Sequence, residues 1–135
     1  HGGVYRAIKR RGMIEGLRAK GIDVLYYCQV DNPLVFMSDP TFIGHHLLAD
    51  AQMSVKVVEK TEASEKVGLV VENDGKVQCL EYSDISDELQ AQTADDGGLL
   101  YRAGNIAVHV YDINFFEEMA EAHLPLHLAN KKSRP

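Results

Sequence analysis

Residues 22–33 read IDVLYYCQVDNP, a largely apolar run that ends in an acid, an amide and a proline. The run is rich in β-branched and aromatic residues and does not alternate cleanly, which predicts a strand buried on both faces, as in a parallel sheet. Ligands of open α/β sheets bind beyond the carboxyl ends of the strands, which is where Asp31 would lie. Its carboxylate could hold a metal ion there, although Asp-Asn-Pro after a strand is more often a plain turn.

The overall composition excludes several classes of protein. A chain of 135 residues suits one domain with one core, and 45% hydrophobic with 25% charged residues is typical of a globular protein. No apolar run approaches the roughly 18 residues that a membrane helix needs. The net charge of -6 argues against a general nucleic-acid binder. We therefore expect neither a membrane nor a nucleic acid among the partners.

Two cysteines, Cys28 and Cys79, each sit inside an apolar run. Their positions favour buried, reduced thiols in a cytoplasmic protein, with a disulfide left open as an alternative. No Cys-x-x-Cys spacing indicates zinc. No signal peptide is visible and the chain begins with His instead of Met, so we expect a chain that was trimmed or cut from a longer one.

The N-terminal third predicts a helix on each side of the central run. Apolar residues at helical spacing predict the first helix over 4–20, and Gly21 supplies its end. Asp39 and Pro40 provide an N-cap and a first helical residue for the second.

The remainder of the chain predicts strands, a hairpin and two further helices. The expected elements are a strand over 54–59, a hairpin over 67–82 that turns at Asn73-Asp74-Gly75, a helix over 84–90 capped by Ser83, strands over 99–103 and 106–111 separated by Gly104-Asn105, and a helix over 113–123 capped by Asp112. Helix-linked strands together with a hairpin favour an α/β fold, with a mixed sheet flanked by helices, over a bundle or a barrel.

No catalytic motif is complete in this sequence. The serines lack the small-residue elbow of a hydrolase, and there is no phosphate loop of the P-loop kind. His45 and His46 are adjacent on a predicted helix and do not share a face. Pro125 separates His123 from His127. Neither histidine pair therefore predicts a metal site.

Three polar residues at the ends of predicted strands remain as candidates: Asp31, Glu81 and Asn105. Two carboxylates and an amide at one edge of a sheet could bind sugar hydroxyls while one acid holds Mg²⁺. From the residue types alone this is one hypothesis beside that of ordinary turns.

Seven blocks follow one another along nearly the whole chain: HGGVYRA (1–7), VDNPLV (30–35), SDPxFIG (38–44), KVVEKT (56–61), ExVG (65–68), EYSDI (81–85) and AGNIAxH (103–109). In this order they resemble the eukaryotic-type UDP-sugar pyrophosphorylases. The EYS and GNIAxH blocks are most similar to the UDP-N-acetylhexosamine (UDP-N-acetylglucosamine) pyrophosphorylases of that family.

The resemblance implies a fold and a reaction. The fold would be a Rossmann-like nucleotidyltransferase domain, of the nucleotide-diphospho-sugar transferase kind. The enzyme would be a uridylyltransferase that converts UTP and N-acetylglucosamine 1-phosphate to UDP-N-acetylglucosamine and pyrophosphate with Mg²⁺ as cofactor. The sugar phosphate oxygen would attack the α-phosphorus of UTP, so the protein need only position the reactants and neutralise charge.

The resemblance also implies roles for particular residues. Asp31 would be the catalytic residue that meets Mg²⁺ and the nucleotide phosphates. Gly68 would contact the sugar through its backbone, Glu81 would bind sugar hydroxyls, and the Asn105 amide would contact the sugar or its acetamido group. The complete set of expected substrate-binding residues is His1, Gly2, Asn32, Gly68, Glu81, Tyr82 and Asn105.

Three departures from the family pattern limit these expectations. His1 stands where members that use acetylated sugars often have Asn, which keeps a glucose-specific or broad-specificity enzyme open. Phe36 stands where the family often has a basic residue. The family's glycine-rich nucleotide loop should precede His1, and a further lysine should follow Pro135.

We therefore expect residues 1–135 to be the central part of a single catalytic domain, incomplete at both ends. The isolated chain is expected to be inactive. A non-catalytic fragment that binds a sugar nucleotide remains the alternative to an enzyme portion.

Overall fold

The computed structural model describes residues 3–123, which fall into two compact units. The first unit comprises residues up to Val55 together with those from Ala107 onward, and the second comprises Lys56–Ile106. Residues 3–123 contain five strands: β1 (Val24–Tyr27), β2 (Met53–Glu59), β3 (Gly68–Asn73), β4 (Lys76–Leu80) and β5 (Ala103–Asp112). They are hydrogen-bonded in the order β1-β5-β3-β4, and β2 also pairs with β5. The predicted features at Pro125, His127 and residues 130–135 lie outside the described residues.

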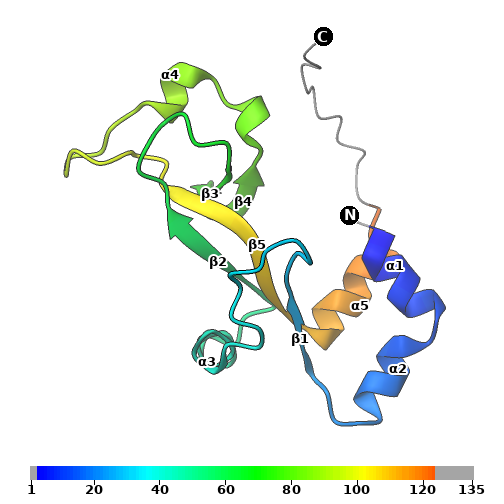
Figure 1. Cartoon of the computed structure of the whole chain (residues 1–135). Helices are drawn as coiled ribbons and strands as arrows, with labels where there is room; N and C mark the ends of the chain where they lie inside the picture. Colours follow the sequence, from blue (N-terminus) through cyan, green and yellow to red (C-terminus); the bar gives the residue numbers. More distant parts are fainter. Residues whose placement is uncertain (1–2, 124–135) are drawn as a thin grey trace. The chain divides into compact units, whose positions relative to one another are not determined.

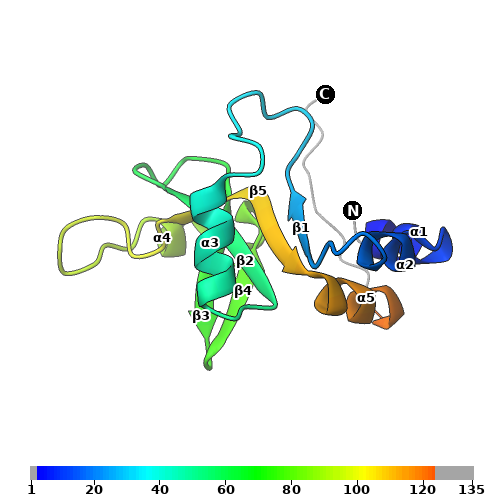
Figure 2. The same ribbon diagram turned by 90° about the horizontal axis from the view of Figure 1, so that it is seen from below.

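Three helices of the first unit lie side by side around a small apolar core (Figure 1 and Figure 2). They are α1 (Gly3–Arg10), α2 (Met13–Arg18) and α5 (Ile113–Glu121). The buried core consists of Ile14, Tyr111, Ile113 and Phe116. Asp112 caps α5 by accepting from the backbone N–H groups of Asn114 and Phe115, at 2.7 and 3.2 Å, which confirms the predicted start of this helix.

The single helix predicted over 4–20 is two helices in the structure. The break falls at Gly12, whose φ of 62° is left-handed and favours glycine. The predicted end at Gly21 is confirmed, because Gly21 has φ 70° and its N–H donates to the Arg18 carbonyl at 2.9 Å. The Ile22 N–H donates to the Leu17 carbonyl at 3.1 Å, which completes a Schellman motif.

The central apolar run forms a short strand, β1 (Val24–Tyr27), that pairs with β5 (Ala103–Asp112). The pairing is antiparallel, with Val24 opposite Asp112 and Tyr27 opposite His109, and every residue of β1 is half-buried. The expectation of a parallel strand buried on both faces is therefore wrong. Tyr27 of the run instead stacks on His109, with 5.6 Å between the ring centroids, and Leu25 packs against the core of the first unit.

Helix α3 (Pro40–Leu48) begins where the sequence predicts. Asp39 accepts from the N–H groups of Thr41 and Phe42 at 3.0 and 3.4 Å, and Pro40 is the first helical residue. The two histidines of this helix separate as expected: His45 is exposed, whereas the buried His46 lies with Nδ1 2.8 Å from the Ser54 hydroxyl.

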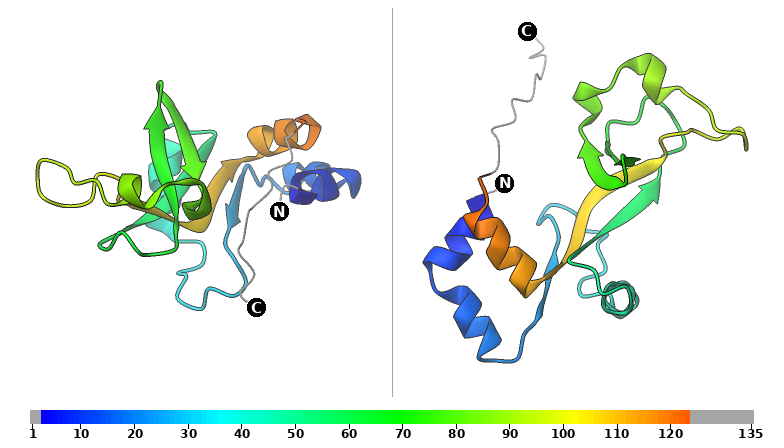
Figure 3. Two further views of the ribbon diagram at one scale, coloured as in Figure 1. Left: turned by 90° about the horizontal axis from the view of Figure 1, so that it is seen from above. Right: turned by 180° about the vertical axis from the view of Figure 1, so that it is seen from behind.

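The second unit is built on an antiparallel hairpin of β3 (Gly68–Asn73) and β4 (Lys76–Leu80), drawn in green in Figure 3. Asp74 and Gly75 have φ of 50° and 72°, so the turn is of type I′ and the predicted hairpin is confirmed. Strand β2 (Met53–Glu59), which matches the predicted strand over 54–59, contributes its last residues to this unit.

Two other predictions for this region are wrong. The helix expected over 84–90 is a 3-10 turn, η1 (Tyr82–Asp84), followed by α4 (Asp87–Gln90). Its cap is Ser86 and not Ser83, because the Ser86 hydroxyl accepts from the Leu89 N–H at 3.3 Å. Strand β5 begins at Ala103 and continues through Gly104-Asn105, so the strand expected over 99–103 does not form and the expected break is absent. A side chain at position 104 would be crowded, because its Cβ would lie 3.2 Å from the Val58 carbonyl oxygen of β2. This close approach explains a glycine inside the strand.

His109 makes the stability of the first unit sensitive to mild acid. Its ring lies beside Tyr27 and Tyr111, and burial lowers the pKa of His109. The unfolded chain, with a His pKa of about 6.5, then binds the proton more readily, so stability falls as the pH drops from about 6.5 through the lowered pKa of the folded state. We expect His109→Phe to lose less free energy of unfolding than the wild type between about pH 7.5 and about pH 5.5 in urea titrations.

The control for this prediction is His45→Phe, which removes an exposed imidazole from α3. Its loss of stability over the same pH range should match that of the wild type. An equal pH dependence in His109→Phe and the wild type would contradict the role of His109.

No helix within residues 3–123 is long and apolar enough to cross a membrane.

Candidate functional site

Three of the predicted site residues come together at one end of the hairpin. Gly68 begins β3 and lies directly opposite Asn105 of β5 in the antiparallel register. Glu81 immediately follows β4, and its Oε1 lies 4.0 Å from the position that a Cβ on Gly68 would occupy. A glycine backbone, a carboxylate and an amide therefore surround one point on the surface of the second unit.

The site also contains a residue that the sequence interpretation assigned to the core. Cys79 is exposed, and its Sγ accepts a hydrogen bond from Asn105 Nδ2 at 3.1 Å. The expectation of buried thiols is thus wrong for Cys79, and Cys28 is half-buried. Neither cysteine forms a disulfide. The available signal was strand periodicity, because Cys79 and Glu81 are two residues apart and thus share a face.

Two leucines lie on the opposite face of the hairpin at the same end. Leu69, one residue after Gly68, is only 1% exposed. It lies opposite Leu80 in the β3–β4 ladder, and Leu80 lines a hollow of about 190 Å³ together with Ile85, Leu89 and Tyr101. At this end the hairpin is therefore packed on the side of Leu69 and Leu80 and open on the side of Cys79 and Glu81, whereas the residues of β4 before Leu80 are exposed.

A buried polar network fixes the segment that follows Glu81. The Lys60 side chain is 1% exposed, and its Nζ donates to Gln90 Oε1 at 3.0 Å. Gln90 Nε2 in turn donates to the carbonyls of Tyr82 and Ile85 at 3.5 and 3.3 Å. Because Gln90 is on α4, this network ties the chain on the C-terminal side of Glu81 to a helix.

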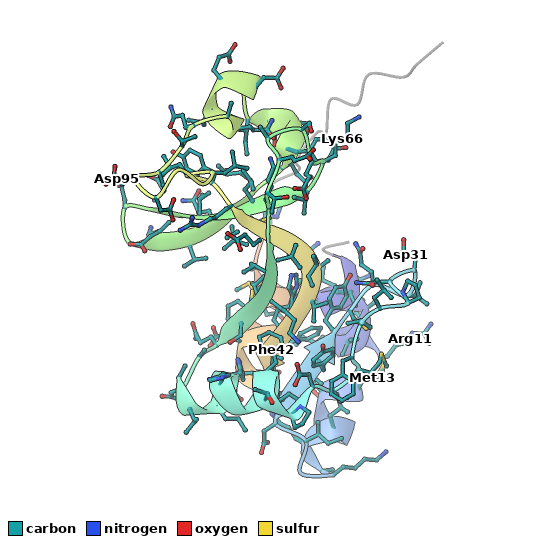
Figure 4. The ribbon with its side chains drawn as sticks, turned by 60° about the vertical axis from the view of Figure 1, so that its left-hand side comes forward. Arg11, Met13, Asp31, Phe42, Lys66 and Asp95 are labelled. Carbon is teal, nitrogen blue, oxygen red and sulfur yellow. The ribbon has the colours of Figure 1, made fainter. Side chains whose placement is uncertain are left out.

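Asp31 and Asn32 belong to the first unit, in the exposed turn after β1, where Figure 4 labels Asp31. Asn32 holds the turn together: its N–H donates to the Gln29 carbonyl at 3.3 Å, and its Oδ1 accepts from the Leu34 N–H at 3.1 Å. The geometry is thus that of an Asx turn, and the metal-binding role of Asp31 stays a prediction. No group of three or more His, Cys, Asp or Glu side chains suited to a metal occurs within residues 3–123.

Of the other expected site residues, Tyr82 starts η1 beside Glu81 and is half-buried. His1 and Gly2 lie outside the described residues.

Comparison with known families decides the relationship of this chain. The family described as UTP–glucose-1-phosphate uridylyltransferase (UDPGP) matches residues 1–134. The chain belongs to this family. The resemblance inferred from the sequence blocks is thereby confirmed.

Relatives within the uridylyltransferase family have names that refer to N-acetylated sugars. The mouse (Mus musculus) UDP-N-acetylhexosamine pyrophosphorylase-like protein 1 is 42% identical over 135 residues, which is 98% of this chain and 27% of that protein. The Saccharomyces cerevisiae UDP-N-acetylglucosamine pyrophosphorylase is 38% identical, over 98% of this chain and 28% of that protein. The chain thus spans about a quarter of the length of these relatives.

Solved structures of the same family share the fold. A candidate UDP-N-acetylglucosamine pyrophosphorylase from Entamoeba histolytica superposes with a TM-score of 0.88 at 35% identity, covering 98% of this chain and 33% of that one. The uridine diphosphate N-acetylglucosamine pyrophosphorylase of Trypanosoma brucei, in complex with an inhibitor, gives 0.75 at 30% identity, covering 81% and 20%. The predicted nucleotidyltransferase-like fold is therefore confirmed.

Proposed function

We propose that this chain carries the sugar-binding part of a UDP-N-acetylhexosamine pyrophosphorylase. The observation that carries the proposal is the convergence of Gly68, Glu81 and Asn105 at one point, in a chain of the uridylyltransferase family. The names of the mouse and yeast relatives support N-acetylglucosamine 1-phosphate over other sugar phosphates. In the proposed reaction a phosphate oxygen of the sugar phosphate bonds to the α-phosphorus of UTP, and the bond to the β-phosphate breaks to release pyrophosphate.

The chemistry of the cluster in the second unit suits a sugar. A carboxylate such as Glu81 accepts hydrogen bonds from hydroxyl groups, whereas an amide such as Asn105 can both donate and accept. The absence of a side chain on Gly68 leaves the backbone open to close approach. In the proposed reaction the protein positions the reactants and needs no covalent nucleophile.

We assign Mg²⁺ binding to Asp31. A single exposed carboxylate fits Mg²⁺, which proteins usually bind through one or two carboxylates and the phosphate oxygens of the substrate. When bound, the ion would neutralise negative charge on the nucleotide phosphates. Asp31 would hold the ion in the turn that Asn32 keeps in shape.

The direct test is an assay of the full-length protein that carries this sequence. With UTP, Mg²⁺ and N-acetylglucosamine 1-phosphate, it should release pyrophosphate and form UDP-N-acetylglucosamine. Glucose 1-phosphate should be used at least about tenfold less efficiently, because it leaves the amide partner of the acetamido group unpaired. No turnover with either sugar phosphate would overturn the proposal.

The family description, which names glucose 1-phosphate, favours a second candidate. In that case the glucose substrate would be preferred in the same assay, in agreement with His1 at a position where acetylated-sugar members often have Asn. Tight binding of a UDP-sugar without turnover would instead indicate a non-catalytic binding module.

Enlarging Gly68 should block the sugar and leave the nucleotide site intact. A Cβ at Gly68 would meet Cys79 Sγ and the Leu80 carbonyl oxygen at 3.4 Å, which is ordinary contact, so alanine fits. The two further methyl groups of valine would cover the point between Glu81 and Asn105. We expect Gly68→Val to raise the KM for the sugar phosphate by about tenfold or more and Gly68→Ala by about threefold, with the KM for UTP unchanged.

A glycine of the first unit provides the control for this series. Gly44 has no atom within 4 Å of the position of an added Cβ, so Gly44→Val should leave both KM values near those of the wild type. Equal KM values for Gly68→Val and the wild type would contradict a sugar site at Gly68.

We propose a cytoplasmic enzyme, with no nucleic-acid or membrane partner. The net charge of -6 and the two unpaired cysteines support this assignment.

A further inference from the structure

The loop that leads into Gly68 is closed by one carboxylate. This β2–β3 loop comprises residues 60–67. Glu65 Oε1 accepts from the backbone N–H groups of Glu62 and Thr61 at 2.8 and 2.9 Å, and from the Thr61 hydroxyl at 3.2 Å. These donors therefore meet at a single oxygen, shortly before the glycine of the proposed sugar site.

The backbone of Glu65 connects the two halves of the loop. Its N–H donates to the Glu62 carbonyl at 3.2 Å, and its carbonyl accepts from the Val67 N–H at 3.1 Å. The backbone N–H groups of Glu62 and Thr61 also lower the pKa of the Glu65 carboxyl, so the side chain is ionised at neutral pH. An ionised acceptor forms stronger hydrogen bonds than a neutral one. Glu65 thus links the beginning of the loop to the residue that precedes Gly68.

Both ends of the β2–β3 loop lie against the chain at the start of β5. The Lys60 N–H donates to the Arg102 carbonyl at 2.8 Å. At the other end, Val67 Cγ1 lies 3.3 Å from the position of a Cβ on Gly104, so the valine packs where this glycine has no side chain. The ends of the loop are therefore fixed, and its shape between them depends on the contacts of Glu65.

The start of β3 depends on this loop because its pairing with β5 is short. Strand β3 pairs with β5 through its first two residues, with Gly68 opposite Asn105, whereas its pairing with β4 continues to Asn73. A change in the loop would therefore shift Gly68 relative to Asn105 and Glu81. Misplacement of a binding group by about 1 Å is enough to weaken a site.

From these contacts we infer that Glu65 is a positioning residue, whose carboxylate holds the β2–β3 loop in the shape that places the Gly68 backbone against the sugar. The inference rests on the proposed function and deepens it, because it names a residue outside the cluster that determines sugar binding. The ligand is the sugar 1-phosphate of the proposed reaction. Glu65 acts through Gly68 and need not touch the sugar or the reacting phosphates.

Steady-state kinetics of the full-length protein test the inference. Glu65→Ala should raise the KM for N-acetylglucosamine 1-phosphate by about tenfold, because the loop would hold Gly68 in place for about a tenth of the time. The KM for UTP and kcat should change by less than about twofold, since the nucleotide is bound elsewhere. Glu65→Gln keeps an accepting oxygen at the same position, so its KM for the sugar phosphate should stay within about threefold of the wild type.

The matched control is Glu62→Ala, which removes the same charge from the same loop. Glu62 is exposed, and it contacts Glu65 through its backbone, which alanine retains. Both KM values of this variant should stay near those of the wild type. An equal rise in Glu62→Ala, or a loss in Glu65→Gln as large as that in Glu65→Ala, would overturn the inference and leave the proposed function standing.

A double-mutant cycle tests whether Glu65 acts through Gly68. In a Gly68→Val background, where the sugar contact is already blocked, Glu65→Ala should raise the KM for the sugar phosphate by less than about twofold more. Additive effects of the two substitutions would show that Glu65 acts on sugar binding by another route, and would overturn the inference.

Amide hydrogen exchange adds a measurement that does not depend on turnover. Without ligand, the amides of Thr61 and Glu62 should exchange about tenfold faster in full-length Glu65→Ala than in the wild type, and Glu62→Ala should resemble the wild type at Thr61. UDP-N-acetylglucosamine should slow the exchange of the wild-type loop. Unchanged exchange in Glu65→Ala would overturn the inference. Absence of both turnover and UDP-N-acetylglucosamine binding in the wild type would overturn the proposed function, and this inference with it.

Discussion

Replacing Asp31 with alanine is expected to lower kcat/KM for UDP-sugar formation by about 10²–10³-fold in the full-length protein. The substitution removes the carboxylate that we assign to Mg²⁺ and the nucleotide phosphates. Asp31→Asn keeps the size of the side chain but not its charge, so it should show a loss of the same order. The measurement is initial-rate kinetics at saturating Mg²⁺ with UTP and N-acetylglucosamine 1-phosphate.

We expect the loss of activity to reflect the missing carboxylate and not a loss of stability, because the hydrogen bonds that Asn32 forms in the turn do not involve the Asp31 side chain. Asn32 provides both of its hydrogen bonds, to Gln29 and Leu34, so the stability change should stay within about 0.5 kcal/mol. Asp23→Ala is the matched control, since it removes an exposed carboxylate just before β1, whereas Asp31 follows the strand. Retained turnover in Asp31→Ala, or an equal loss in Asp23→Ala, would contradict the assignment.

The features that the sequence predicts correctly are those determined by neighbouring residues. Asp39 and Asp112 each cap a helix through N–H groups two and three residues later. The hairpin turn at Asp74 and Gly75 needs left-handed backbone, which these residue types accept. Such signals are local, so no knowledge of the distant chain is needed to interpret them.

The features that were predicted wrongly depend on distant or competing partners. The orientation and burial of β1 depend on β5, which lies far along the chain, so the apolar run alone could not reveal an antiparallel partner. Apolar periodicity on both sides of Gly12 predicts one helix, but glycine disfavours helix interiors and the left-handed backbone at Gly12 ends the first helix. Ser83 and Ser86 could each cap a helix in this segment, and Ser86 is the one whose hydroxyl accepts from the backbone N–H of Leu89.

The candidate site shows the same division. The roles of Gly68, Glu81 and Asn105 came from the family resemblance, because a strand-end carboxylate or amide alone does not distinguish a turn from a ligand. Their convergence depends on the register that places Gly68 opposite Asn105, and no sequence pattern reports that register. The apolar neighbours of Cys79 in the sequence predict a core position, whereas its exposure depends on the sheet face that it shares with Glu81.

The second large effect is expected at Gln90, whose amide donates to two carbonyl groups of the segment that follows Glu81. Gln90→Leu would keep the side-chain volume but remove the acceptor of the buried Lys60 ammonium and the donor to the carbonyls of Tyr82 and Ile85. We expect it to lower the local stability of the second unit by about 3 kcal/mol, because a buried charged group loses a hydrogen-bond partner. Amide hydrogen exchange in residues 82–90 should then be about a hundredfold faster, and the KM for the sugar phosphate should rise because Glu81 adjoins this segment.

A second substitution distinguishes the loss of the Lys60–Gln90 hydrogen bond from a general destabilisation. Lys60→Met removes the charge and keeps the apolar stem, so adding it to Gln90→Leu should slow the exchange again, since a buried pair replaced by apolar groups is tolerated better than one left half-made. Gln92→Leu, at an exposed position just beyond α4, is the matched control and should change the exchange little. If Lys60→Met instead added to the damage of Gln90→Leu, the damage would not come from a Lys60 ammonium left without its hydrogen-bond acceptor, and the prediction would be contradicted.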